Sequence, residues 1–451
     1  MDRIGKKICT WGAVSVVVWL LLGASAQGAI VGESGSSFHL VVKQDVIVTS
    51  DGDSFIMWGY ALSDTDWGPT SSRAQYPGPT LIVTEDMPVS ITLRNELPKT
   101  AGHVSIVFPG QKVSATGGGH TGLLTHEAPP LETLKGLPLP IEVLKNTGSV
   151  TYTFTPTEPG TYLYRSGTRA DLQVEMGLIG ALIVRPKGVP PGGDLFKKYA
   201  YNHVESEYDR EFLYLISEMD PRIHRWVEGG QWGKIDFTTY FPTNWFINGR
   251  NYPDILADNH VPWLPTQPYN CQPRMHPGEK VLLRFIGAGR DIHPMHFHGN
   301  DFETIAVDGR LLSSQPGAGP DLAWKATTIK SIPGQTADLI WTWTGKELGW
   351  DIYGHSPGEP LEPNEYAPNH GKPFPVVLPH RDAVAYGPFY SGSPFLGGDG
   401  ELPPGHAGLN ASGGYFYMWH SHTEKELTSN DIWPGGLISF MIVEHPDVPI
   451  D

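Results

Sequence analysis

Two short segments of the chain carry histidines at alternating positions. The pairs are His296/His298 and His420/His422, with His293 three residues before the first pair, and together they account for five of the 18 histidines. Because successive side chains of a strand point to opposite faces, the two histidines of each pair share a face. If the two strands are neighbours, four imidazoles converge. Neutral imidazole suits copper, zinc, iron and nickel, so the spacing predicts a metal site; the alternative is a set of hydrogen-bonded core histidines.

The segments around these histidines have the pattern of short strands joined by tight turns. Glycine (53) and proline (41) are both abundant, and Pro-Gly turns precede several β-rich runs. Both halves contain such a turn, then a strand, and near the end a glycine-rich apolar strand, so we expect two copies of one β-sandwich. The predicted strands cover residues 38–48, 80–83, 89–93, 150–154, 161–164 and 178–184 in the first half, and 211–217, 281–286, 337–344, 414–422 and 436–444 in the second.

The first 26 residues have the pattern of a signal peptide. Arg3, Lys6 and Lys7 precede an apolar run, Trp11–Leu22, that is short for a membrane span, and Ala24-Ser25-Ala26 is a typical cleavage site. We therefore expect a periplasmic or extracellular protein with no stable membrane span after cleavage. The alternative is an uncleaved anchor.

The rest of the chain divides into two expected domains. The first covers residues 30–187 and the second covers residues 200–451, with a Pro/Gly-rich linker at residues 186–194. Within the second domain, residues 356–412 are rich in Pro, Gly and His and lack clear periodicity, which predicts a long loop insertion. Such a loop is typical of a lid, an oligomer arm or a small subdomain.

Charge and cysteine content exclude some classes of function. The chain has 48 acidic and 32 basic residues, a net charge of −16, which argues against binding nucleic acid through a general field. Cys9 lies in the expected signal peptide, so Cys271 is the one cysteine left in the mature chain. No intrachain disulfide is then possible, and we expect Cys271 to be a buried thiol.

The histidine segments resemble motifs of the multicopper oxidases. Residues 293–299 are similar to that family's H-P-x-H-x-H-G motif, and residues 419–422 to its terminal H-C-H motif. The resemblance extends over residues 76–97 and 159–186 in the first half. It implies an all-β fold of two cupredoxin-like Greek-key sandwiches. It also implies that His293 occupies a type 1 (blue) copper position, His296 a type 2 position, and three histidines type 3 positions: His298, His420 and His422.

The chain departs from this family where the blue copper should be bound. Ser421 stands in place of the cysteine of the H-C-H motif, and Glu426 falls where the next type 1 histidine should be. A hydroxyl cannot replace the thiolate of a blue copper site. We therefore expect no blue copper, and conventional laccase activity is not expected.

The first half also lacks the family's ligands. Val107 and Pro109 fall where one histidine motif should be, and Arg165-Ser166-Gly167 where the other should be. The first domain is therefore expected to hold no copper ligands. Its nearby histidines lie in glycine-rich loops, where single histidines are mostly solvated: His103, His120 and His126.

Three hypotheses of function remain. The first is a copper-binding protein with one or two ions on the histidines of the second domain, and with a simpler copper-dependent oxidoreductase reaction if it is an enzyme. The second is a non-catalytic scaffold or partner-binding subunit of a periplasmic or extracellular complex. The third is a zinc or manganese centre. No catalytic residue is assigned and enzyme activity is left open, while the resemblance raises the expectation of a homotrimer.

Overall fold

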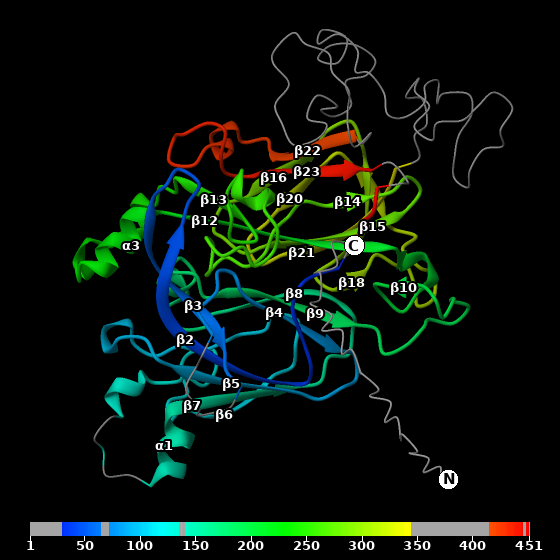
Figure 1. The fold of residues 1–451 in the computed structure, drawn as a ribbon. Helices are drawn as coiled ribbons and strands as arrows, with labels where there is room; N and C mark the ends of the chain where they lie inside the picture. The colour runs from blue at the N-terminus through cyan, green and yellow to red at the C-terminus, as the bar shows by residue number, and fades with distance from the viewer. Residues whose placement is uncertain are drawn as a thin grey trace, which may run out of the picture.

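The chain folds into four stacked β-layers in a computed structural model (Figure 1). The structure describes residues 29–64, 72–134, 137, 140–343, 415–444 and 448–450. The predicted signal peptide and the predicted insertion at residues 356–412 lie outside the described residues. Within them, no helix is both long enough and apolar enough to span a membrane.

The first sandwich is formed by two sheets from the first half of the chain. The first outer sheet has the strand order β3 (Ser54–Leu62), β2 (Ser37–Val48), β5 (Val89–Asn95), β7 (Ser149–Phe154) and β6 (Ser114–Gly117). The first inner sheet has the order β1 (Glu33–Ser34), β4 (Gly78–Thr84), β9 (Ile179–Arg185) and β8 (Gly160–Arg165). Inward-pointing residues of both sheets form one core, to which alternate positions of β2 and β5 contribute.

The second sandwich repeats this arrangement and carries the histidine segments. The second inner sheet has the order β13 (Asn244–Ile247), β12 (Arg210–Met219), β15 (Lys280–Gly287), β21 (Thr336–Thr342), β17 (Phe302–Val307) and β18 (Arg310–Leu311), and β19 (Trp324–Ala326) also pairs with β17. The second outer sheet has the order β14 (Arg274–Met275), β23 (Ile438–Val443), β22 (Tyr415–Ser421), β16 (His293–Phe297) and β20 (Thr328–Ser331). The prediction of all-β sandwich domains is therefore confirmed.

Other elements are short. The strands β10 (Lys198–Tyr199) and β11 (Glu207–Tyr208) form a separate two-stranded sheet. The α-helices are α1 (Ile141–Gly148), α2 (Ala170–Gln173) and α3 (Pro221–Glu228). The 3₁₀ turns are η1 (Lys99–Ala101), η2 (Leu131–Thr133), η3 (Val204–Ser206), η4 (Trp232–Lys234), η5 (Phe237–Thr239), η6 (Asp254–Leu256) and η8 (Glu424–Leu427).

Helix α3 follows β12 of the second half but packs on the first sandwich. Its first turn is set by Asp220, whose side chain accepts a hydrogen bond from the Arg222 amide, and by Pro221 at the first helical position. Ile223 and Val227 then join the core of the first sandwich. The helix therefore ties the two halves of the chain together.

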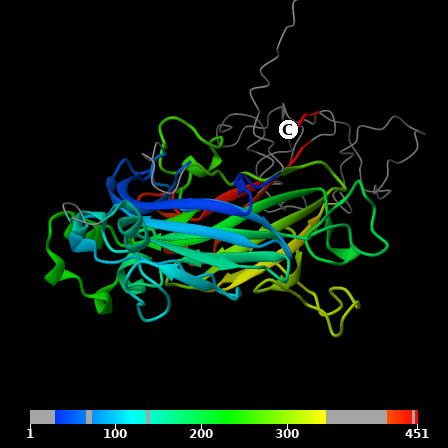
Figure 2. The same cartoon turned by 90° about the horizontal axis from the view of Figure 1, so that it is seen from below.

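The two inner sheets lie against each other (Figures 1 and 2). Leu163 and Ile179 of the first inner sheet belong to one apolar cluster with Leu213, Leu215 and Ile286 of the second. Burial of these apolar side chains stabilises the contact between the two sandwiches. We infer that the sandwiches pack as one body through this layer.

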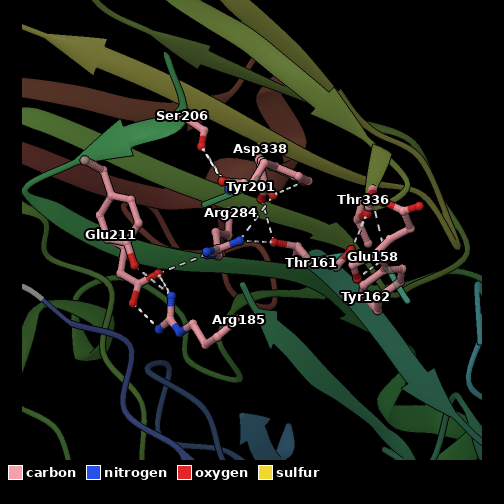
Figure 3. A network of polar contacts seen from close by, with 12 residues as sticks. Glu158, Thr161, Tyr162, Arg185, Tyr201, Ser206, Glu211, Arg284, Thr336 and Asp338 are labelled. Carbon is pink, nitrogen blue, oxygen red and sulfur yellow. Dashed lines mark hydrogen bonds and ion pairs between the residues drawn. The ribbon is translucent and has the colours of Figure 1, made fainter. Parts of the chain in front are cut away.

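A buried ionic network crosses the same layer (Figure 3). Arg284 of β15 is fully buried, with Nε 3.0 Å from Glu211 Oε2 and Nη1 3.2 Å from Asp338 Oδ2. Arg185 of β9, in the first sandwich, donates from Nη1 to the same Glu211 Oε2 at 2.6 Å. Burial favours the neutral form of Glu211, but the two guanidinium groups outweigh it and lower the pKa of Glu211 to about 2. The carboxylate is therefore held charged between two arginines.

Thr161 of β8 completes the network on its other side. Its hydroxyl donates to Asp338 Oδ1 at 2.5 Å, and its carbonyl accepts from the Thr336 hydroxyl at 2.7 Å. Tyr201 donates to the second Asp338 oxygen at 2.5 Å. Each charge in the network thus has a partner, as buried charges require.

Candidate metal centre

Strand pairing brings the two predicted histidine pairs together. The strands β16 and β22 are antiparallel neighbours, with His296 opposite His420 and Phe297 opposite Trp419. Along β16, buried positions alternate with partly exposed ones, so His293 lies on the core face and His296 on the outer face.

The core face of these strands is aromatic. Phe297 and Trp419 stack with ring centroids 4.4 Å apart and planes at 11°, and Phe302 of β17 stacks on the same indole at 5.4 Å. All three rings are buried in the core of the second sandwich. This packing holds the pairing of β16 with β22 in the register that aligns the histidines.

The outer face carries four imidazoles in contact. The Nε2 atoms of His298 and His420 are 2.9 Å apart, and the centroids of the His296 and His422 rings are 4.9 Å apart. The centroids of His296 and His420 are 5.7 Å apart, which joins the two pairs. The structure therefore brings together four of the five predicted site residues.

Hydrogen bonds orient three of these rings. His420 Nδ1 donates to its neighbouring Ser421 carbonyl at 2.7 Å, which leaves Nε2 of the neutral ring as the lone-pair nitrogen. His422 Nδ1 lies 3.2 Å from Glu424 Oε1, and His296 Nδ1 lies 2.9 Å from the Thr328 hydroxyl. Such partners on the second nitrogen orient a histidine for metal binding.

Burial favours the neutral form of three of these rings. It lowers the pKa of His296, His298 and His420, and the neighbouring imidazoles lower these values further. The pKa of His298 falls to about 4. A neutral imidazole is the form that coordinates a metal.

The residues fit copper by ligand type, and one pair has the spacing of two ligands. Two cis ligands at metal–nitrogen distances of about 2.0 Å are roughly 3 Å apart, and the His298 and His420 nitrogens are separated by 2.9 Å. Within the described residues no three ligand atoms of the four imidazoles lie within 4.8 Å of one another, so the rings would have to close around a shared ion. Imidazole without a thiolate suits Cu(II) and also Zn(II).

His293 lies apart from this cluster. Its Nε2 is 3.0 Å from Glu218 Oε2, and its Nδ1 is 2.8 Å from Glu426 Oε2. Burial lowers the pKa of His293, but hydrogen bonds and charge from both carboxylates outweigh it and raise the pKa to about 9. The ring is therefore an imidazolium with both nitrogens occupied, and in this state it has no lone pair for a metal.

Ser421 belongs to the same network. Its hydroxyl donates to Glu426 Oε2 at 2.5 Å, and the side chain is fully buried. The three positions that the resemblance assigned to blue copper, His293, Ser421 and Glu426, are thus joined by hydrogen bonds. An ion pair between an imidazolium and carboxylates therefore occupies the place at which the resemblance predicts a blue copper ion.

The sequence reasoning missed Glu218, the second carboxylate at His293. Its position on β12 was informative, because Tyr214 and Ile216 face the core of the second sandwich and alternate with residues that pack towards the first sandwich. Glu218 continues that alternation and is buried. A charged residue at an apolar position of a strand predicts a buried partner.

The structure brings the first-half motif positions next to each other. Val107 and Arg165 form an isolated backbone bridge, with the Val107 amide donating to the Arg165 carbonyl at 2.9 Å. Gly167 lies against Val107 with no room for a side chain. Nearby, however, His103 and His120 both contact the buried Glu127.

Comparison with known proteins is consistent with this fold. Residues 72–188 match the sequence pattern of the family described as "Multicopper oxidase". The solved structure of "Multicopper Oxidase mgLAC" is 17% identical with a TM-score of 0.51, covering 92% of this chain and 87% of that chain. The blue copper oxidase from Nitrosomonas europaea is also 17% identical with a TM-score of 0.51, covering 91% and 86%. No curated protein matches the sequence.

These likenesses concern a segment and a fold. Residues 72–188 are similar in sequence to the multicopper oxidases, and the described chain shares its fold with the two solved structures.

Proposed function

We propose that the chain binds one or two copper ions through His296, His298, His420 and His422 and has no blue copper site. The observation that carries the proposal is the register of β16 and β22, which sets His296 opposite His420 and brings both histidine pairs to one face. Pairing of His298 with His420, and of His296 with His422, offers two subsites. His293 is not a ligand in this proposal, because two carboxylates occupy its nitrogens.

Copper bound there would supply single-electron chemistry to the site. The Ser421 backbone carbonyl and the side chains of Glu424 and Thr328 contact the second ring nitrogens of three histidines and so orient these rings. A thiolate is absent from the His293, Ser421 and Glu426 positions, so the fast electron-accepting centre of a laccase is not part of the proposal. If the chain is an enzyme, we expect a simpler copper-dependent oxidoreductase.

The test is copper content of the purified chain after copper loading and desalting, by elemental mass spectrometry. We expect one or two tightly held coppers in the wild type, and a loss of at least one in H296A/H420A. H126A/H276A, which replaces two histidines outside the cluster, is the matched control and should keep the wild-type content. Circular dichroism should show that the double variants remain folded.

The results separate the alternatives. Unchanged copper in H296A/H420A would overturn the assignment. A wild-type protein that retains no metal would favour a non-catalytic scaffold or partner-binding subunit. Retention of zinc or manganese in place of copper, after loading with a mixture, would favour the third hypothesis.

The proposal also covers the export of the protein and its oligomeric state. Arg3, Lys6, Lys7 and the Ala24-Ser25-Ala26 motif support export through a cleaved signal to the periplasm or outside the cell. N-terminal sequencing of the mature protein should then begin near Gln27. The resemblance supports a homotrimer, which light scattering of the purified chain would test.

A further inference from the structure

A second group of ligand-type side chains lies in the first sandwich, outside the cluster described above. Nitrogen and oxygen atoms of His103, His120 and Glu127 lie within 4.8 Å of one another, and within the described residues no other three His, Cys, Asp or Glu side chains do so. We propose that these residues form a separate site for a divalent transition-metal ion, of the zinc or copper type. The proposal does not rest on copper binding by the second sandwich.

Backbone pairing places the three residues together. His120 and Glu127 face each other across an isolated antiparallel bridge, in which the Glu127 amide donates to the His120 carbonyl at 2.9 Å. The next residue, Ala128, pairs with Val104 in a second bridge and so brings His103 alongside. The Gln173 amide group donates to the His103 carbonyl at 2.7 Å and fixes that segment.

The three ligand atoms have the spacing of a coordination shell. Glu127 Oε2 lies 2.9 Å from His120 Nδ1 and 3.4 Å from His103 Nδ1, and the two imidazole centroids are 4.9 Å apart. Ligands at bond lengths near 2.0 Å in a tetrahedral shell are roughly 3.3 Å apart. The Gly122 amide donates to the same His120 Nδ1 at 3.1 Å, so an ion bound among these atoms would replace that hydrogen bond.

The carboxylate is buried and oriented as a ligand. Glu127 is 7% exposed, and its other oxygen, Oε1, accepts from the Thr168 hydroxyl at 2.8 Å. The Thr168 hydroxyl is itself hydrogen-bonded to the Ser105 hydroxyl, 2.8 Å away, and this contact helps to position it. Oε2 is thus left facing the two imidazoles, an arrangement in which outer hydrogen bonds orient a ligand.

Charge also favours a cation. Of the described residues, the basic side chains in ion-pair contact with Glu127 are His103 and His120. A buried carboxylate needs a positive partner, and a divalent ion bound by two neutral imidazoles supplies it. The side chains of His103 and His120 are 37% and 55% exposed, so a fourth position would open to solvent. Two imidazoles and a carboxylate, without thiolate, suit Zn(II), Cu(II) and Fe(II).

The test uses Zn²⁺ in calorimetry and Co²⁺ as a spectroscopic probe, in the H296A/H420A background. This background removes the second-sandwich cluster, so any remaining site is counted alone. We expect one Zn²⁺ per chain, and Co²⁺ absorption typical of a four- or five-coordinate ion. Adding E127Q, which keeps the side-chain volume, should weaken Zn²⁺ binding at least 100-fold, because it removes a charged ligand.

Three further variants guard against a folding artefact. H120N changes an exposed side chain and should also weaken binding at least 10-fold, whereas H126A, in the same loop, should leave it unchanged. T168V should weaken it about 10- to 100-fold, the usual effect of losing a hydrogen bond that orients a ligand. The proposal is overturned if the background variant binds no Zn²⁺, or if E127Q and H120N bind it as the background does.

Discussion

His293 Nε2 lies 3.0 Å from Glu218 Oε2, so a histidine of the second outer sheet is joined to strand β12 of the second inner sheet. Glu426, in the turn after β22, holds the other ring nitrogen at 2.8 Å. The contact therefore crosses the second sandwich and links its two sheets through a charged ring.

Restoring the thiolate alone should not restore blue copper. In S421C the His293 nitrogens stay bound to Glu218 and Glu426, and the carboxylate of Glu426 stands where an imidazole is needed. After copper loading, we expect the visible spectrum to lack the intense thiolate-to-copper band of His₂Cys sites. The triple variant S421C/E218Q/E426H removes these obstacles and is the comparison in which the band should develop. An intense band in S421C alone would show that His293 is free to coordinate.

Stability should fall in alkaline solution as His293 loses its proton. Its pKa is raised to about 9 in the folded chain, against about 6.5 for an unperturbed histidine. A raised pKa contributes stability that is complete below about pH 6.5 and is lost as the pH rises through 9. The contribution is roughly 3 kcal/mol for a shift of this size.

Urea unfolding at a series of pH values between 6 and 10 measures this loss. The variant H293Q should be less stable than the wild type at pH 6 and should show a smaller decrease towards pH 10. If the free energy of unfolding had the same pH dependence in the two proteins, the loss of stability would not come from the His293 imidazolium.

Removing Arg284 should destabilise the whole chain. In R284M, Asp338 loses its buried cation and Glu211 keeps only Arg185. Breaking a buried pair in this way costs about 3–5 kcal/mol. The exposed pair of Arg73 with Asp45 provides the control, since R73M should cost less than about 1 kcal/mol. Denaturant unfolding curves compare the two, and similar losses would contradict a structural role for the network.

Acid should act on the same network through Glu211. Its pKa is lowered to about 2 in the folded chain, so its contribution is complete above the unfolded value, near 4.3, and is lost as the pH falls from there towards 2. E211Q should therefore be less stable than the wild type at pH 7, and the difference should be smaller at pH 3, because part of the contribution of Glu211 is lost between its unfolded and folded pKa values. Unfolding midpoints at pH 7, 5 and 3 check this, and a constant difference would contradict the assignment.

Local patterns were sufficient to predict most strands and the histidine cluster. His296 and His298 were assigned to one face because strand alternation depends on neighbours only, and the structure has them on the outer face with His420. Helix α3 was not predicted, although Asp220-Pro221 is a common helix start.

Long-range contacts could not be predicted in the same way. Glu218 reaches His293 across 75 positions of sequence, and the pair exists only once β12 and β16 face each other in the sandwich. His103 and His120 lie on separate segments that isolated bridges align, so the sequence predicted each as a single solvated loop residue and gave no role to Glu127. Their relation depends on tertiary packing, which no local period encodes.

The stack of Phe297 on Trp419 has a consequence for how the chain tolerates change. A slip of one residue between β16 and β22 would drive the imidazoles into the aromatic core and expose the rings, at a large cost in apolar burial. The two rings therefore fix the register in which the histidines of β16 and β22 face each other. Mutations that keep every histidine but shrink Trp419 should loosen the alignment of the four imidazoles, so the integrity of the site depends on residues that carry none of its chemistry.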